Sequence, residues 1–441
     1  MHSLALALHK KGYEVTGSDD EINEPSRSRL KAAGLLPEQT GWFPEKISTE
    51  LSAVILGMHA RADNPELLKA QQLGLPVYSY PEYLFEQSKY KKRIVIGGSH
   101  GKTTITAMSL HILKQSGINF DYMAGSAVPG FDNMVKLSDA PLIILEGDEY
   151  LSSPIDRRPK FHWYRPHIAV LSGIAWDHIN VFPTFENYTE QFRIFIEKME
   201  EGGTLFYCEE DEVLRSVAES ADAGIKKIPY RTPEHITENG ITYLIKESDK
   251  YPLLVFGKHN LQNAEAARWI CRECGITDEQ FYKALSSFKG AARRLEKIFD
   301  NGSLTVFRDF AHSPSKLKAT VNAVAQQFPH RKVIACMELH TFSSLSENFL
   351  NEYAHCMDEA GQAVVFYNPE TITHKKLPPV SMDAVKSAFK RDDLLVFDSP
   401  AELSAWLHQC DFNNSVLLLM SSGTFSGLDV NSLLKKAETS V

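Results

Sequence analysis

The sequence predicts an α/β protein built from three consecutive parts, at residues 1–88, 89–291 and 292–441. The chain of 441 residues is too long for a single hydrophobic core. Helical and strand patterns alternate along the chain, which is typical of parallel sheets. In the second part, an apolar strand, a glycine loop and a helix follow one another at residues 94–113. That order is typical of a phosphate-binding domain.

Composition and charge argue against several classes of protein. Hydrophobic residues make up 43% and charged residues 23% of the chain, as in ordinary globular proteins. The formal charge of -9 at pH 7 disfavours a surface for nucleic acid. No apolar run reaches the roughly 18 residues of a membrane helix, and the first residues lack the basic leader and cleavage site of a signal peptide. We therefore expect a cytoplasmic protein without membrane insertion, and its oligomeric state is left open.

The first part alternates helices and strands but begins on a helix. Helices are predicted at Leu4–Lys11 and Pro65–Leu73, and strands at Tyr13–Gly17, Ala53–Leu56 and Val77–Tyr80. An α/β unit of this type normally begins with a strand and a glycine turn. The first strand of this domain is therefore expected to be missing.

The loop IVIGGSHGKTT at residues 94–104 carries the strongest functional signal. Three β-formers, Ile94–Ile96, precede glycines that allow backbone N–H groups to approach a ligand closely. Lys102 is placed to reach phosphates, and the hydroxyl of Thr103 to bind magnesium. Ile96 occupies the position of the first glycine in the common G-x-x-x-x-G-K-[ST] pattern. The alternative is an ordinary glycine turn, but the flanking strand and helix favour nucleotide binding.

Acidic residues follow the next strand of the second part. The run LIILEGDEY places Glu146, Asp148 and Glu149 at the end of the strand predicted at Pro141–Leu145. Ligands bind at the carboxyl ends of the strands in open parallel sheets. These carboxylates therefore suit Mg²⁺ opposite the phosphate loop, and a solvated acidic loop is the alternative.

Two further motifs of the second part leave alternatives open. His178, in LSGIAWDH after a strand at Ile168–Leu171, is either a metal or phosphate contact or a loop histidine with ordinary partners. Asn260 and Asn263, in FGKHNLQN, share one helix face and either contact a purine edge or cap the helix.

The third part is α/β again, with strands at residues 304–307, 333–336, 363–366 and 416–420. In AARRLE, Arg293 or Arg294 either reaches transferring phosphates or lies in a solvated basic turn. Asp309, in FRDFAHSP, either accepts from ribose hydroxyls or caps a helix. The runs ELHTFS and MSSGTFSG, at 338–343 and 420–427, suit a carboxylate or phosphate contact or are plain turns.

Taken in order, GSHGKTT, EGDEY, DH, GKHNLQN, RRLE and DFAHSP resemble the motifs of the Mur ligase family. The resemblance covers all three parts of the chain. It implies an ATP-dependent, ADP-forming amide ligase of peptidoglycan biosynthesis. It also implies a Rossmann-like N-terminal domain for a UDP-sugar, here lacking its first strand, a central P-loop ATPase domain, and a C-terminal Rossmann-like domain for the amino substrate.

The resemblance also assigns roles to the matching residues. The ATP phosphates would be held by the residues of the loop, which are Gly98, Ser99, His100, Gly101, Lys102, Thr103 and Thr104. Two Mg²⁺ ions would be bound by Thr103, Glu149 and His178. Asn260 and Asn263 would lie at the adenine and Asp309 at the ribose. Arg294 would contact the γ-phosphate, so the implied catalytic set is Lys102, His178 and Arg294.

Within the family, details such as DEY followed by DRRPKF, and MSSGTFSG, resemble the branch that recycles a cell-wall tripeptide. The predicted reaction therefore joins L-alanyl-γ-D-glutamyl-meso-diaminopimelate to UDP-N-acetylmuramate through an acyl phosphate. The alternatives are ligation of L-alanine to the same nucleotide sugar and an ATP-binding module without catalysis.

The sequence departs from the family pattern in two places. Gly173 and Ala175 stand where an Asn and a Glu are usual, so contacts from those positions are not expected. The missing first strand suggests a misassigned start or a shortened chain, and an incomplete nucleotide-sugar site.

Overall fold

The computed structural model describes the chain except for residues 59, 223, 239 and 440–441, and it forms two compact units. The first unit contains residues 1–174, 189–231 and 266–281, and the second contains residues 175–188, 232–265 and 282–441. The α/β class predicted from the sequence is confirmed, and the boundaries predicted at 88 and 291 stay predictions.

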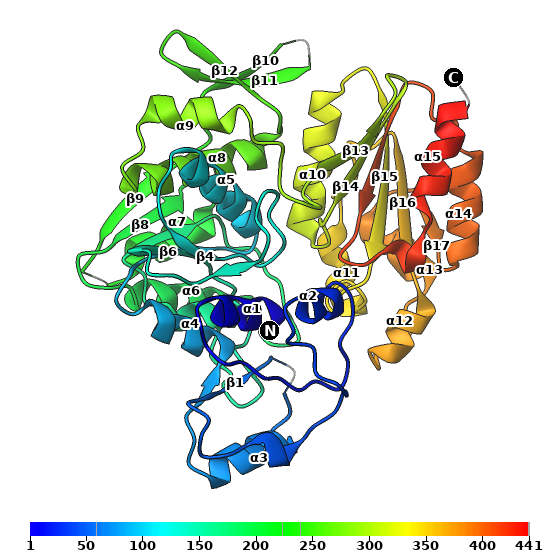
Figure 1. The fold of residues 1–441 in the computed structure, drawn as a ribbon. Helices are drawn as coiled ribbons and strands as arrows, with labels where there is room; N and C mark the ends of the chain where they lie inside the picture. Colours follow the sequence, from blue (N-terminus) through cyan, green and yellow to red (C-terminus); the bar gives the residue numbers. More distant parts are fainter. Residues whose placement is uncertain (59, 223, 239, 440–441) are drawn as a thin grey trace. The chain divides into compact units, whose positions relative to one another are not determined.

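A mixed, mostly parallel sheet forms the centre of the first unit (Figure 1), in the order β5-β4-β6-β3-β7-β8-β9. Its strands are β3 (Lys92–Gly97), β4 (Asp121–Met123), β5 (Val135–Lys136), β6 (Leu142–Glu146), β7 (Ile168–Leu171), β8 (Thr204–Cys208) and β9 (Lys226–Tyr230). The buried runs of β3, β6 and β7 are apolar at nearly every position, as expected for strands covered on both faces. Helices α5 (Lys102–Gln115) and α7 (Glu212–Ser220) belong to this unit.

The N-terminal part of the first unit contains the parallel pair β1 (Val54–Leu56) and β2 (Val77–Ser79). Its helices are α1 (His2–Lys10), α2 (Ser26–Ala32), α3 (Pro65–Gln72) and α4 (Tyr80–Ser88). The strand predicted at Tyr13–Gly17 is wrong, because these residues are irregular. A strand needs a neighbour to pair its backbone N–H and C=O groups, and among the described residues this segment has none.

The second unit is built on a sheet in the order β13-β14-β18-β15-β16-β17. Its strands are β13 (Glu296–Asp300), β14 (Leu304–Asp309), β15 (Lys332–Leu339), β16 (Gln362–Tyr367), β17 (Leu395–Phe397) and β18 (Ser415–Met420). Only the β13–β14 pair is antiparallel within this described sheet. Its helices are α10 (Pro314–Gln327), α11 (Glu347–Leu350), α12 (Pro369–His374), α13 (Met382–Phe389), α14 (Pro400–Gln409) and α15 (Val430–Thr439).

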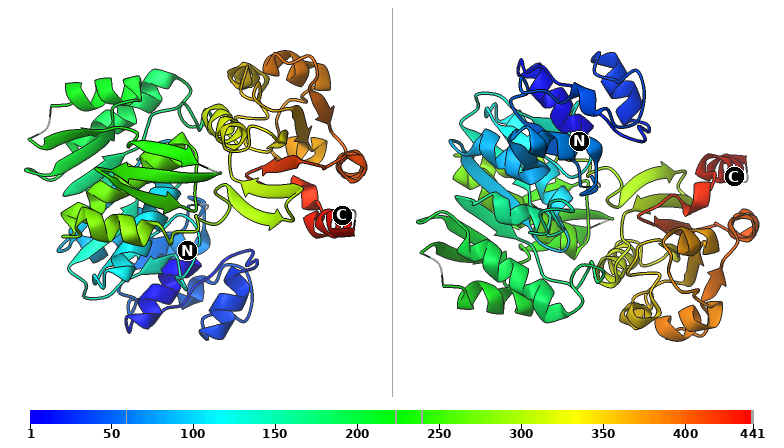
Figure 2. Two further views of the ribbon diagram at one scale, coloured as in Figure 1. Left: turned by 90° about the horizontal axis from the view of Figure 1, so that it is seen from above. Right: turned by 90° about the horizontal axis from the view of Figure 1, so that it is seen from below.

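Successive side chains of β15 point to opposite faces of the sheet, and each face has its own hydrophobic core. Val333 and Ala335 face the core that α10 covers, and Ile334 and Cys336 face the core that α14 and α15 cover. Figure 1 and the two further views in Figure 2 show these helices on opposite faces of the sheet. The result is a three-layer α/β/α domain. Its helices cover the faces of the sheet, so a ligand site can form from the loops at the carboxyl ends of the strands.

A small antiparallel sheet, β10 (His235–Glu238), β11 (Ile241–Lys246) and β12 (Asp249–Leu253), also belongs to the second unit. Helices α6 (Phe185–Glu197), α8 (Lys258–Glu273) and α9 (Asp278–Leu285) contain the boundaries between the units. No helix among the described residues is long and apolar enough to cross a membrane.

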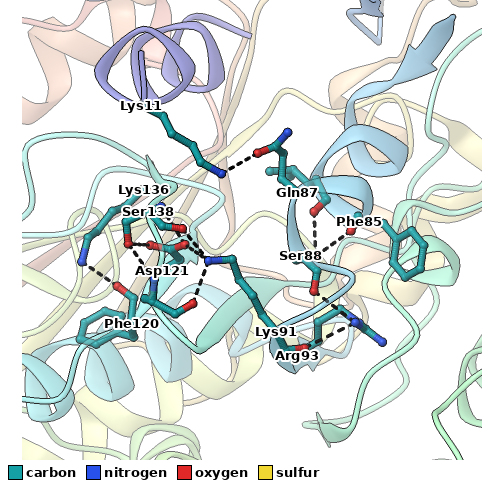
Figure 3. Close-up of polar contacts among 12 residues, drawn as sticks. Lys11, Phe85, Gln87, Ser88, Lys91, Arg93, Phe120, Asp121, Lys136 and Ser138 are labelled. Carbon is teal, nitrogen blue, oxygen red and sulfur yellow. Dashed lines mark hydrogen bonds and ion pairs between the residues drawn. The ribbon is translucent and has the colours of Figure 1, made fainter. Parts of the chain in front are cut away.

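A buried arginine joins α4 to the central sheet of the first unit (Figure 3). Arg93 in β3 is 2% exposed, and its Nη1 donates to the carbonyls of Ser88 and Lys89 at the end of α4. Its Nε donates to the Tyr164 carbonyl at 2.9 Å, and its Nη2 lies 2.6 Å from Glu200 Oε1. One guanidinium thus satisfies carbonyls of two segments, including those left unpaired by the end of a helix.

Nearby, Lys91 and Asp121 form a second buried contact of the same junction (Figure 3). Lys91 Nζ lies 2.8 Å from Asp121 Oδ2 and donates to the carbonyls of Ser138 and Ala140. Asp121 is fully buried and also accepts from the Ser138 amide and hydroxyl. The ion pair therefore ties β4 to the segment that leads into β6.

Replacing Arg93 with methionine should lower the free energy of unfolding by about 3 kcal/mol, because buried carbonyls lose their donor. Urea denaturation of the purified protein measures this change. Lys92→Met is the matched control, since Lys92 is exposed on the same strand and its loss should cost under about 0.5 kcal/mol. Equal stability of the two variants would contradict the structural role of Arg93.

Candidate functional site

The glycine loop of the first unit lies at the end of β3, the strand between β6 and β7. Gly98 and Gly101 have left-handed φ values of 126° and 78°, and α5 begins at Lys102. A Cβ on Gly98 would lie 2.2 Å from Ser172 Oγ. Only glycine therefore fits at residue 98, and the predicted order of strand, loop and helix is confirmed.

Contacts from the segment after β7 fix the middle of the loop. The Ser99 amide donates to the Gly173 carbonyl at 3.0 Å, and the Ser172 hydroxyl donates to the His100 carbonyl. A Cβ on Gly173 would lie 2.4 Å from His100 Nε2. The histidine ring thus uses the space that a larger residue would fill, which gives a physical reason for glycine at this departure from the family pattern.

Lys102 forms the most buried charge contact of the loop. Its Nζ lies 2.5 Å from Glu149 Oε2 and 2.6 Å from the Gly98 carbonyl oxygen. Glu149 is 1% exposed. Burial alone would lower the pKa of Lys102, but the carboxylates of Glu149 and Asp148 outweigh it and raise the pKa. A lysine that stays charged at the mouth of the loop suits an anionic ligand.

Oxygen atoms gather beside this lysine. The Thr103 hydroxyl donates to Glu146 Oε1 at 2.7 Å, and the Gly125 amide donates to Glu146 Oε2 at 2.8 Å. Asp148 is ion-paired with Lys160, at 2.5 Å. Hydroxyl and carboxylate oxygens are the ligands that Mg²⁺ prefers, so Thr103, Glu146 and Glu149 fit such an ion. Thr104 is buried in the first turn of α5.

His178 belongs to the second unit, whereas Lys102, Thr103 and Glu149 belong to the first. A metal site shared between His178 and Glu149 therefore stays a prediction. Its neighbour Asp177 is buried, and Asp177 Oδ2 lies 3.8 Å from His312 Nε2 and 3.6 Å from Lys316 Nζ. Burial alone would raise the pKa of Asp177, but the neighbouring His312 and the charge of Lys316 hold the pKa well below its ordinary value.

The predicted purine and ribose residues all lie in the second unit. Asn260 and Asn263 are both buried, in the first turns of α8, and Asn260 Nδ2 donates to the Phe256 carbonyl. Asp309 ends β14 and accepts from the Thr320 hydroxyl at 2.6 Å. Asp309 does not cap α10, whose N-cap residue is Ser313. The helix-capping alternative for Asp309 is therefore wrong, and its ribose role stays a prediction.

Two arginines precede β13 in the same unit. Arg293 has a left-handed φ of 55°, and its Nη2 donates to the Gly423 carbonyl at 2.5 Å. The guanidinium of Arg294 lies 4.6 Å from the centroid of the Phe310 ring. Arg294 thus lies beside the strand end that carries Asp309, and its contact with a γ-phosphate stays a prediction.

Sequence reasoning gave Glu338 no role of its own within the run ELHTFS, although the structure buries it at the carboxyl end of β15. Glu338 Oε2 accepts from the Ser421 hydroxyl and, at 2.8 Å, from the Phe425 amide. One signal was available, because Glu338 is an acidic residue in the otherwise apolar run VIACMEL. Buried carboxylates of this kind are rare unless they are paired.

Comparison with family models assigns all three parts of the chain to one family. The model described as "Mur ligase family, catalytic domain" matches residues 1–92. "Mur ligase middle domain" matches residues 96–271, and "Mur ligase, glutamate ligase domain" matches residues 293–423.

Similar proteins were found by sequence and by structure. The UDP-N-acetylmuramate–L-alanine ligase of Sulfurihydrogenibium sp. is 31% identical over 81% of this chain and 78% of its own length. The solved UDP-N-acetylmuramate–alanine ligase of Thermotoga maritima has a TM-score of 0.70 at 20% identity, over 100% of this chain and 97% of that one. The murein peptide ligase of Psychrobacter arcticus has a TM-score of 0.66 at 23% identity, over 99% and 96%. Both structural matches show the fold.

The curated sequence relatives overturn the prediction that the amino substrate is a tripeptide. The curated relatives, one matched over 97% of this chain, are named UDP-N-acetylmuramate–L-alanine ligases. The motif details at DRRPKF and MSSGTFSG were therefore a misleading guide to the amino substrate, and the L-alanine alternative fits better. A few loop residues carry less information than similarity spread over the whole chain.

Proposed function

The chain belongs to the Mur ligase family, and we propose that within this family it joins L-alanine to UDP-N-acetylmuramate. As a family member it is a three-domain α/β protein and an ATP-dependent, ADP-forming amide ligase of peptidoglycan biosynthesis. The name shared by its curated relatives is the observation that carries the choice of L-alanine.

The first step of the proposed reaction is phosphoryl transfer. The muramoyl carboxylate attacks the γ-phosphorus of ATP, the bond to the ADP oxygen breaks, and an acyl phosphate forms. Two anions must approach each other, so positive charge has to lie at the transferring group. Lys102, already charged and buried beside the loop, supplies this charge, and Arg294 is proposed to add a second contact.

The remaining nucleotide contacts are also proposals. The loop residues 98–104 would bind the phosphates, Asn260 and Asn263 the adenine, and Asp309 the ribose. Mg²⁺, held by Thr103 and Glu149 with His178 at a second ion, would neutralise phosphate charge when bound. The oxygen donors beside Lys102 support the first of these ion sites.

In the second step, the amine nitrogen of L-alanine attacks the acyl carbon. The carbon–nitrogen bond forms, the bond to the phosphate oxygen breaks, and phosphate leaves while the nitrogen loses its proton. Because the reaction consumes ATP and a UDP-sugar, we place the enzyme in the cytoplasm.

The substrate proposal predicts a clear preference in an amine comparison. With UDP-N-acetylmuramate, ATP and MgCl₂, phosphate release should be at least about tenfold faster with L-alanine than with the murein tripeptide or glycine. Coupled phosphate release and mass spectrometry of the product measure this preference. Faster turnover with the tripeptide would refute L-alanine as the substrate, and no turnover with any amine would refute the ligase itself.

A further inference from the structure

Glu338 has two carboxylate oxygens in very different surroundings. Oε2 accepts hydrogen bonds from the Ser421 hydroxyl and the Phe425 amide. Oε1 lies 3.8 Å from His340 Nδ1, too far for a hydrogen bond, and no other described residue donates to it. Glu338 is 2% exposed, and only one of its two carboxylate oxygens accepts hydrogen bonds from the described residues.

Hydrogen bonds at the carbonyl and at the amide of Gly423 fix the loop opposite this carboxylate. Arg293 donates to the Gly423 carbonyl, and the Gly423 amide donates to Ser421 Oγ at 2.6 Å. A Cβ on Gly423 would lie 2.9 Å from Glu338 Oε2 and 3.0 Å from His340 Nδ1. Glycine therefore lets the loop pass closely over the carboxylate and the imidazole.

These residues lie where a parallel sheet binds its ligands. Glu338 comes from the carboxyl end of β15 and Ser421 from the carboxyl end of β18, which are neighbouring parallel strands. A carboxylate oxygen without a protein donor, on a side chain that is almost fully buried, favours a cationic ligand that carries N–H groups. One carboxylate oxygen and one imidazole offer too few ligands for a structural metal site. A primary ammonium group meets both needs, because it brings charge and up to three donors.

We propose that Glu338 Oε1 binds the ammonium group of the amino substrate, while Oε2 fixes the loop at residues 421–425. This inference rests on the proposed ligase function and adds a specificity-determining contact to it. His340 borders the same point and limits the space beside the ammonium. No bond is made or broken at Glu338, whose role is to bind and orient the amine before attack.

Glu338→Gln tests this proposal, because glutamine keeps an oxygen that accepts from Ser421 and Phe425 but loses the charge. The KM for L-alanine should rise at least about tenfold, while the KM values for ATP and UDP-N-acetylmuramate stay within about twofold. The exposed Glu359→Gln serves as the matched loss of charge and should leave all three KM values unchanged. An unchanged KM for L-alanine in Glu338→Gln overturns the proposal.

Gly423→Ala provides a second variant that keeps every charge. The backbone of Gly423 lies outside the left-handed region, so alanine is allowed there, but its Cβ displaces Glu338 and His340. The KM for L-alanine should again rise selectively. If Glu338→Gln does not fold, this variant decides, and an unchanged KM for L-alanine overturns the proposal.

Hydroxylamine trapping separates this proposal from the proposed ligase function. Hydroxylamine is uncharged at pH 7.5 and needs no carboxylate to bind it, so it should trap the acyl phosphate equally in wild type and Glu338→Gln. No hydroxamate from the wild type means that the ligase function fails. Normal hydroxamate in both proteins with equal KM values for L-alanine means that only the ammonium contact fails.

Discussion

Replacing Lys102 with methionine should reduce kcat for phosphate release on the order of 1,000-fold. Lys102 is the charged side chain that the structure holds against the glycine loop, with Nζ 2.6 Å from the Gly98 carbonyl oxygen. Methionine fills a similar volume but cannot stabilise the charge that develops on the transferring phosphoryl group. The coupled assay of phosphate release at saturating ATP measures the loss.

The buried partner of Lys102 sets a second expectation for the same variant. Glu149 is 1% exposed and would lose its cation, so the free energy of unfolding should fall by roughly 3 kcal/mol. Assays are therefore run well below the melting temperature of the variant, with circular dichroism as a check on folding.

Lys114→Met is the matched control for Lys102→Met. Lys114 lies on the same helix, α5, and is exposed, with Nζ donating to the Gly130 carbonyl. Its kcat should stay within about twofold of the wild type. Near-normal turnover in a folded Lys102→Met protein would contradict a role of the phosphate loop in the reaction.

The phosphate loop could be predicted because all of its information is local. An apolar strand, glycines with left-handed φ and the start of α5 are contiguous at residues 92–115. The spacing of Asn260 and Asn263 on one helix is local as well. Strands such as β7 and β18 were also predictable, since each is a short apolar run bounded by polar residues.

The contacts between distant residues could not be predicted in this way. Glu338 and Ser421 are brought together only by the pairing of β15 with β18. Arg93 satisfies carbonyls of α4 and of the segment at Tyr164, which no local pattern connects. The segment predicted as a strand at Tyr13–Gly17 contains residues that favour strands, but it has no described neighbour to pair with. It therefore forms no strand despite its local propensity.

Substrate choice illustrates the same limit at the level of function. The chemistry of a family depends on the phosphate loop and nearby acids, which the sequence displays as motifs. In the binding mode proposed above, the identity of the amine depends on side chains at the ends of different strands, such as Glu338 in β15 and Ser421 after β18. The motif runs that suggested a tripeptide contain neither Glu338 nor His340, and the prediction made from them was wrong.

Replacing Gly98 with alanine should lower kcat/KM for ATP by at least about 100-fold, the loss expected when reacting groups are misplaced by about 1 Å. The new Cβ would lie 2.2 Å from Ser172 Oγ and 3.0 Å from the Ser172 amide nitrogen. Because Ser172 is itself bonded to the His100 carbonyl, the loop has to move rather than the serine alone.

A second glycine separates this clash from backbone strain. Gly117 also has a left-handed φ, of 69°, but a Cβ there meets no described atom within 4 Å. Gly117→Ala should therefore cost only about 1 kcal/mol of stability and leave kcat/KM for ATP unchanged. If Gly98→Ala and Gly117→Ala lose the same share of kcat/KM for ATP, backbone strain and not contact with Ser172 causes the loss.

The double variant Gly98→Ala/Ser172→Ala tests the cause directly, because it removes the oxygen that the new Cβ would meet. Part of the lost kcat/KM for ATP should return, since the Ser172 amide nitrogen remains 3.0 Å from the Cβ position. Non-additivity of this kind is expected only for residues in contact. A double variant as impaired as the product of the single effects would show that residue 98 acts through something other than its packing against Ser172.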